Sequence, residues 1–344
     1  MFFIKTYLFL VIFMENKGIE NISSNFNPKL KAHKVKQIEF KNEMTVSQLI
    51  DEFDSSGVLG SGRVSRARNL LIDMVNDDDM QIFLSVAGPM VPGGLRNVIA
   101  DMIRNRQIST LITSGANLTH DMVEAFGGRH YKDLGFDDEE LNDAGIGRIA
   151  DVYTQSGDFE VFEEKITEML EIIEKKYDNP KDKNIISIEK LLYEFGMLID
   201  DENSILYLAA HNGVNIFAPG LIDSMIGLQL WIFSQDHNLH VDAVGDMHHL
   251  SDVVFETEKV GAIMLGGGIP KHYTLASNLL KGGIDAGFQI TMDRPETGSL
   301  SGARLEEAKS WSKAKHGSKL VTVIGDTTIL FPLIYAGAMD HFKE

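Results

Sequence analysis

The segment at residues 298–316, GSLSGARLEEAKSWSKAKH, places a lysine beside a tryptophan near the end of an Ala/Glu/Lys helix pattern. The chain has no cysteine, so covalent catalysis has to use another nucleophile, and a lysine amine can form imines with carbonyl compounds. Only the neutral amine attacks, so Lys313 would need desolvation, which the ring of Trp311 is suited to supply. The same spacing also fits a solvated helix face with Glu and Lys pairs.

A second segment, GAIMLGGGIPKH, puts three glycines between an apolar run and an expected helix start. Gly266, Gly267 and Gly268 permit positive φ angles and a close approach of the backbone to a phosphate, and a helix N-terminus adds N–H donors. Lys271 stands where the dinucleotide fingerprint has its third glycine, so this is not that fingerprint. A plain tight turn is the alternative interpretation.

The loop in LITSGAN is a weaker candidate for ligand binding. Thr113 and Ser114 are placed to contact a phosphate or a ribose. The alternative is structural, with Asn117 or Thr119 capping the next helix. In the same segment, His120 is a candidate for a side chain that faces a pocket.

A group of acidic and histidine side chains at residues 246–252 has the ligand types of a metal site. Adjacent histidines point in different directions on a helix or a strand, which favours a surface cluster. We therefore predict no metal site; the residues concerned are Asp246, His248, His249 and Asp252.

Short apolar runs without alternation predict strands that are buried on both faces. Loops with small residues and amphipathic helices follow most of them, as in parallel βαβ units. We expect an α/β fold with a doubly wound, mostly parallel, Rossmann-like sheet, whose ligands bind past the carboxyl ends of the strands. The predicted strands are Gln81–Ala87, Ile108–Ile112, Asn215–Ala218, Ala262–Leu265, Phe288–Thr291 and Leu320–Ile324.

A helical insertion is expected between the second predicted strand, Ile108–Ile112, and the third, Asn215–Ala218. One helical face there is apolar, and a further helix is expected from Ser187. The apolar face consists of Phe159, Phe162, Ile166, Met169, Leu170 and Ile173.

Three parts are expected along the chain. Residues 1–13 are apolar but too short to cross a bilayer, and no signal-peptide cleavage site follows them; we expect a start-site artefact or a disordered tail, with Met14 as the true start. Residues 14–45 are expected to form an N-terminal arm that ends at Thr45, a candidate N-cap. Residues 46–344 are expected to form a single catalytic domain.

The formal net charge of −18 argues against nucleic-acid binding, which needs a basic surface. It favours cationic partners, although most of these charges are expected only to keep the surface soluble. The lack of cysteine excludes disulfides and thiolate metal sites, and it fits a cytoplasmic protein without a membrane anchor.

Three segments together resemble the deoxyhypusine synthase family in its archaeal or bacterial branch, namely LGGGIPKH, SGARLEEAKSWSK and IGDTTILFPL. The match is clearest from about Asn212 to Ala338, and AGPMVPGGLR and TSGANLTHD fit the same frame. The resemblance implies that NAD takes a hydride from spermidine, which is cleaved, and that its four-carbon unit forms an imine with an enzyme lysine. A lysine of the hypusine-carrying translation factor then displaces the enzyme lysine, and the stored hydride reduces the new imine.

The resemblance also implies roles for individual residues. The family's imine-forming lysine corresponds to Lys313, and its proton-transferring histidine corresponds to His272. The residues implied to bind the polyamine are Glu307, Trp311, Asp223 and His120, and those implied to bind NAD are Gly266, Gly267, Gly268, Thr113, Ser114, Asp326 and Thr327. Residues 46–344 would then be an NAD-binding domain of a homotetramer with active sites shared between paired subunits.

The sequence departs from the eukaryotic pattern of this family at several positions. Leu228 and Leu300 replace acidic residues, His120 stands near a glutamate position, and GPMVPGG replaces a loop rich in serine and asparagine. Loss of a carboxylate removes an ammonium anchor, so the polyamine is expected to bind differently or to be a related one. We expect Asp293 and Glu296 to substitute for the lost anchors.

Two other functions remain open on the sequence. A relative that passes the aminobutyl group to a free amine would make a homospermidine-like product, and the lost carboxylates favour that alternative. A catalytically silent NAD-binding or assembly protein is the other, and the presence of Lys313, Glu307 and His272 argues against it.

Overall fold

The computed structural model describes residues 34–177 and 184–343. The chain divides into two compact units, Met1–Gln37 and Ile38–Glu344. Residues 34–37 of the first unit are exposed and have no helix or strand. Residues 1–13, and residues 14–33 of the predicted arm, lie outside the described residues. Residues 38–45 of that arm contain a turn but no helix or strand, and the arm stays a prediction.

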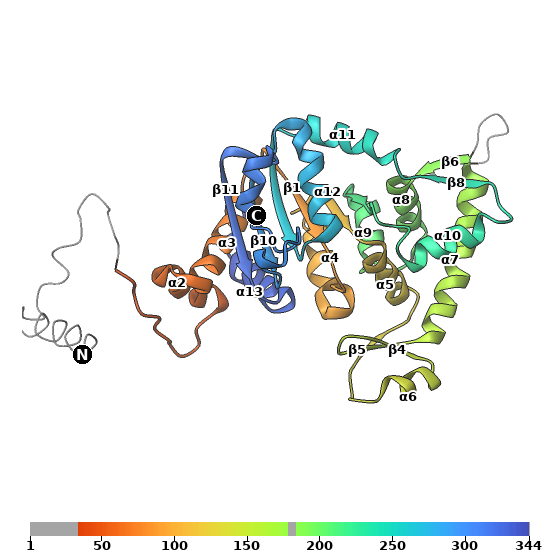
Figure 1. The fold of residues 1–344 in the computed structure, drawn as a ribbon, viewed down its shortest axis with the longest axis horizontal. Coiled ribbons are helices and arrows are strands. Elements are labelled where there is room, and N and C mark those ends of the chain that lie inside the picture. The colour runs from red at the N-terminus through yellow and green to blue at the C-terminus, as the bar shows by residue number, and fades with distance from the viewer. Residues whose placement is uncertain (1–33, 178–183, 344) are drawn as a thin grey trace, which may run out of the picture. The chain divides into compact units, whose positions relative to one another are not determined.

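A parallel sheet of six strands lies at the centre of the second unit (Figure 1). Its strands follow the order β11-β10-β9-β1-β2-β7, and every neighbouring pair is parallel. Renumbered along the chain, this is the 3-2-1-4-5-6 order of dinucleotide-binding folds, which reverses between β1 and β9. The bounds are β1 (Met80–Val86), β2 (Thr110–Thr113), β7 (Asn215–Phe217), β9 (Lys259–Leu265), β10 (Ile284–Thr291) and β11 (Ala314–Ile324).

The predicted α/β fold class is confirmed, and each predicted apolar run overlaps one of these strands. Their side chains alternate between two cores because successive residues of a strand point to opposite faces. Ile82, Leu84 and Val86 of β1 belong to one core, and Phe83 belongs to the other. The first core is covered by α3 (Leu59–Val75), α4 (Arg96–Arg104) and α13 (Thr327–Met339), and the second by α11 (Asp246–Glu256) and α12 (Gly268–Asn278).

The predicted helical insertion contains α7 (Ser156–Tyr177) and α8 (Ile188–Leu198). The predicted apolar face of α7 is buried, except for half-buried Phe159. Short strands were missed here because they are too short and polar to give a pattern. The antiparallel sheet β3-β5-β4 lies beyond the N-terminal end of α7 in Figure 1, and β6 pairs with β8. Their bounds are β3 (His130–Lys132), β4 (Ile146–Ile149), β5 (Val152–Gln155), β6 (Asn184–Ser187) and β8 (Leu239–Asp242).

Helix caps decide where several helices begin. As predicted, Thr45 caps α2 (Val46–Ser56). The structure adds a capping box with Gln48, and Ser187 caps α8. The predicted caps of α5 (Gly115–Ala125) are wrong. Ser114 caps that helix by accepting a hydrogen bond from the amide of Asn117, whose side chain accepts from the amide of Val91.

The remaining helices connect these layers. They are α6 (Asp138–Asp143), α9 (Ile205–Asn212) and α10 (Met225–Phe233), with short turns η3 (Val91–Leu95), η4 (Leu279–Lys281), η5 (Pro295–Thr297) and η6 (Leu305–Trp311). Within the described part of the chain, no helix is both long and apolar enough to span a bilayer.

Candidate functional site

Lys313 lines a cavity of about 420 Å³ together with three other candidate residues, and we call this the lysine cavity. His272 comes from the second turn of α12, and Glu307 and Trp311 come from η6. The helix predicted over this segment is shorter than expected. It is a 3-10 helix that ends at Trp311, because the chain must turn there to enter β11.

The backbone around Lys313 is held at both of its polar groups. The Lys313 amide donates to the carbonyl of Ala308 (2.9 Å), and the Lys313 carbonyl accepts from the amide of Ile284 (3.1 Å). Ser312, just before it, has a φ of 56°, a left-handed conformation that is costly for a residue with a Cβ. Gly283 packs so closely behind Lys313 that a Cβ there would lie 2.4 Å from the Lys313 carbonyl carbon. The surrounding structure therefore imposes the turn that presents Lys313.

The ring of Trp311 lies near the Lys313 amine. Its centroid is 5.8 Å from Nζ, within the range of a cation–π contact. The ring is also 66% exposed, so it does not exclude water from the amine within a single chain. Desolvation of the Lys313 amine therefore requires a further group that covers the Trp311 ring and the amine.

Lys271 contributes to the lysine cavity, a role that no sequence pattern indicated. The residue is 1% exposed, and its ammonium donates to the carbonyls of Leu300 (2.8 Å) and Ala303 (2.7 Å). Burial lowers the pKa of Lys271 to about 8, and the carboxylates of Glu307 and Glu306 oppose that shift. Lys271 thus ties the 299–304 loop to α12 across the cavity wall.

Replacing Lys271 by methionine should destabilise the protein and loosen the lysine cavity. Two part-buried carbonyls would lose their donor, and an unsatisfied buried group costs about 1–3 kcal/mol of the free energy of unfolding, so we expect a loss toward the lower end of that range. We expect a lower midpoint in denaturant titrations and a higher KM for the polyamine that the sequence resemblance implies. Lys281→Met, just beyond the same helix, is the matched control, and equal effects of the two substitutions would contradict this role.

The three glycines form a tight turn that is covered by the 299–304 loop. Gly266 and Gly268 have positive φ angles, and a Cβ on Gly267 would lie 2.5 Å from Ser301. The Gly268 amide donates to Ser301 Oγ (2.8 Å). None of the three glycines lines any of the cavities described in this section. The turn therefore has a packing role in this structure, and its contact with NAD stays a prediction.

His120 and Asp223 line a different cavity, of about 890 Å³, which we call the histidine cavity. His120 comes from α5, and Asp223 lies in the turn before α10. Leu228, one of the positions that lost a carboxylate, also lines it. The histidine cavity shares no lining residue with the lysine cavity, so the predicted polyamine residues fall into two groups on one chain.

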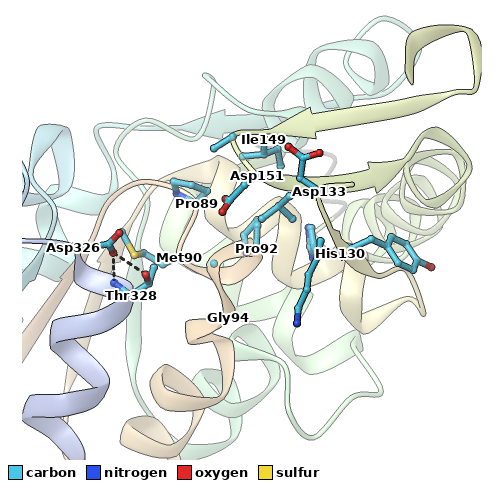
Figure 2. A pocket seen from close by; sticks show the side chains of 15 residues that line it. Pro89, Met90, Pro92, Gly94, His130, Asp133, Ile149, Asp151, Asp326 and Thr328 are labelled. Atoms are coloured by element: carbon cyan, nitrogen blue, oxygen red, sulfur yellow. Dashed lines mark hydrogen bonds between the residues drawn. The ribbon is translucent and has the colours of Figure 1, made fainter. Parts of the chain in front are cut away.

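A third cavity, of about 780 Å³, lies at the carboxyl end of β1, and we call it the switch-point cavity (Figure 2). The GPMVPGG loop forms one wall, and Asp326 and Thr328 at the start of α13 form another. Asp326 accepts hydrogen bonds from the Thr328 amide and hydroxyl (both 2.7 Å) and so caps α13. Thr328 faces this cavity, whereas the predicted Thr327 is buried and does not line it.

Thr113 and Ser114 are occupied by internal hydrogen bonds. Thr113 is completely buried, and its hydroxyl donates to the carbonyl of Val86 (3.1 Å). Ser114 accepts from the amide of Asn117 as the cap of α5. Neither residue lines the switch-point cavity, and the contact of either residue with NAD stays a prediction.

The predicted surface cluster at 246–252 is only partly correct. Asp246 is 1% exposed, and its carboxylate accepts from the amide of Glu189 (2.8 Å) at the start of α8. This burial raises the pKa of Asp246 to about 6. His249 pairs with Glu189 at 3.2 Å. Within residues 34–177 and 184–343, no group of three His, Asp or Glu side chains is placed to hold a metal ion.

Comparison with known proteins decides the family. The family model described as deoxyhypusine synthase matches residues 48–338. The chain is 60% identical over 307 residues to a probable deoxyhypusine synthase of Methanothermobacter thermautotrophicus, covering 89% of this chain and 98% of that one. It is 44% identical over 302 residues to a similarly named protein of Methanopyrus kandleri, covering 88% and 96%.

The chain belongs to the deoxyhypusine synthase family. It is therefore an enzyme of the transferase class. The crystal structure of a candidate deoxyhypusine synthase from Entamoeba histolytica has the same fold, with a TM-score of 0.61, 18% identity, and coverage of 90% of this chain and 98% of that one.

The two leucines that depart from the eukaryotic deoxyhypusine synthase pattern lie in different cavities. Leu300 lines the lysine cavity, and Leu228 lines the histidine cavity. Asp293 and Glu296, the expected substitutes, line neither cavity. The structure therefore gives them no contact with a polyamine bound in either place.

Proposed function

We propose that this deoxyhypusine synthase transfers the 4-aminobutyl group of spermidine to a lysine of the hypusine-carrying translation factor, through an imine on Lys313. The observation that carries the proposal is the lysine cavity, where Lys313, Glu307, Trp311 and His272 meet. Glu307 offers a carboxylate to an ammonium group, and Trp311 offers an aromatic face to a cationic chain. His272 is placed to exchange protons with a bound amine.

The switch-point cavity fits the NAD that the family generally uses. It lies where the strand order reverses, and the helix N-terminus at Asp326 adds backbone donors beside it. The carboxylate of Asp326 would accept from ribose hydroxyls, and the apolar side chains of Met90 and Pro89 would pack against a ring. NAD, when bound, supplies the hydride acceptor and donor for the cycle.

We further propose that one active site combines the lysine cavity of one chain with the histidine cavity of another, within a homotetramer. Two observations support this arrangement. The family's polyamine residues are divided between two cavities with no common lining residue, and Trp311 leaves Lys313 open to water. A second copy over the lysine cavity would add His120 and Asp223 and would desolvate the amine.

The proposal is tested with purified protein, NAD and labelled spermidine, with and without the hypusine-carrying factor of the same organism. Label on a lysine of the factor is the expected result. Label only in free amines would refute transfer to a protein and would favour homospermidine-like transfer. The observation that favours this second function is the loss of carboxylates at Leu228 and Leu300. No labelled product of either kind would indicate a silent NAD-binding protein.

A further inference from the structure

Three side chains join α5 and β3 in a hydrogen-bonded row. The carboxylate of Glu124 lies 2.7 Å from Nδ1 of His130, and Nε2 of His130 lies 3.0 Å from Nδ1 of His120. The His130 side chain is only 6% exposed. Arg96 lies 3.7 Å from the other oxygen of Glu124. Glu124 and His130 are therefore held in place, and the row ends at His120.

The chemistry of the groups decides where the protons lie. An ionised carboxylate only accepts, so Nδ1 of His130 carries a proton and donates it to Glu124. With both rings neutral, Nε2 of His130 then has a lone pair, and the bond to His120 needs a proton on Nδ1 of His120. This leaves the lone pair of His120 on Nε2, the nitrogen for which the described structure provides no partner.

His120 lines the histidine cavity, whereas His130 lines the switch-point cavity (Figure 2). Burial lowers the pKa of His120 to about 4, the neighbouring His130 adds to the shift, and Glu124 opposes it. His120 is therefore neutral at physiological pH. The other charged groups lining its cavity are Asp223 in the turn before α10, Arg148 on β4, and Glu160 and Glu163 on α7.

We propose that His120 is a base of the transfer reaction, with His130 and Glu124 positioning its free Nε2 and accepting the charge. The inference rests on the proposed function, since it assigns the proton acceptor for an amine bound in the histidine cavity. A bound amine in its ammonium form gives one proton to Nε2 of His120 and becomes neutral. The Nδ1 proton of His120 passes to Nε2 of His130, so His120 is again neutral and the positive charge lies on His130, beside Glu124.

This arrangement resolves a conflict between burial and basicity. A buried imidazole is a poor base because its charged form is desolvated. When the Nδ1 proton of His120 moves to His130, the positive charge lies beside the carboxylate of Glu124. His120 is then neutral even though it has accepted the proton of the amine. Glu124 and His130 are thus positioning residues, and His120 is the group that contacts the amine.

The proton arrangement is tested directly by NMR of the full chain labelled with ¹⁵N-histidine. At neutral pH we expect His120 to be neutral with its proton on Nδ1. In His130→Phe, which removes the acceptor, this preference should disappear. A wild-type His120 with its proton on Nε2, or one that is charged at pH 7, would overturn the proposal. The experiment needs no substrate, so its outcome does not depend on the proposed function.

The kinetic test uses Glu124→Gln, which keeps an oxygen for the His130 Nδ1 proton and removes the charge. We expect the tautomer of His120 to persist, kcat to fall, and the acid limb of the pH profile to move about one unit lower, because the base is weaker. His120→Asn should lower kcat on the order of 10²-fold. His248→Asn, at an exposed histidine outside the three cavities, is the control.

The two proposals fail in different ways. Retention of the wild-type pH profile in Glu124→Gln, in an enzyme that His120→Asn inactivates, would refute the relay and leave the proposed transfer intact. The Nδ1 tautomer in a protein that transfers no aminobutyl group to any amine would refute the proposed function, and the relay's role in transfer with it.

Discussion

Replacing Lys313 by arginine is expected to abolish aminobutyl transfer. The guanidinium stays protonated at neutral pH and cannot form an imine, while its charge and length leave the cation–π contact with Trp311 possible. Borohydride added to wild-type protein with NAD and labelled spermidine should fix label on Lys313, and peptide mapping should locate it there. The arginine variant should retain no label and no measurable transfer.

Lys309→Arg is the matched control for that experiment. Lys309 lies on η6 close to Lys313 in sequence, but it is exposed and does not line the lysine cavity. It should be trapped in neither the wild type nor the variant, and transfer should persist after its substitution. Label fixed on Lys271 in place of Lys313 would contradict the assignment. That outcome is disfavoured because the Lys271 ammonium already donates hydrogen bonds to the carbonyls of Leu300 and Ala303.

The large sheet could be predicted from sequence because its strands are buried on both faces. Burial on both faces produces unbroken apolar runs such as Ala262–Leu265, which differ clearly from amphipathic helices. The strands of the small sheets have exposed residues, as in His130–Lys132, and their pairing depends on contacts that are not local in sequence. No local pattern could therefore place His130 beside His120.

The lysine cavity was predictable because the family motifs name its residues, and three of them share one short segment. The glycines at 266–268 and the Thr113–Ser114 pair show the limit of such reasoning. Residue type allows either ligand contact or internal packing, and only the fold shows that Ser301 covers the glycine turn. Lys271 shows the converse, since a buried lysine bonded to two carbonyls leaves no mark in the sequence.

Mixing two inactive variants is expected to restore activity if the active site is shared between chains. Lys313→Ala removes the nucleophile from the lysine cavity, and Asp223→Lys puts a repelling cation into the histidine cavity. Each alone should be inactive, because every site contains one defect. In mixed oligomers, one kind of site pairs an intact lysine cavity with an intact histidine cavity. Random assembly should recover about a quarter of wild-type activity.

The size of the recovery separates the possible architectures. Sites built within one chain would give no recovery, since each chain carries a defect of its own, and that result would refute the shared site. Two variants of the same cavity, such as Lys313→Ala with Glu307→Ala, form the control, because no pairing of chains can place both intact residues in one lysine cavity. Recovery in the first mixture and not in the second would assign Lys313 and Asp223 to opposite chains. The exposed ring of Trp311 would then be one wall of a site that the partner closes.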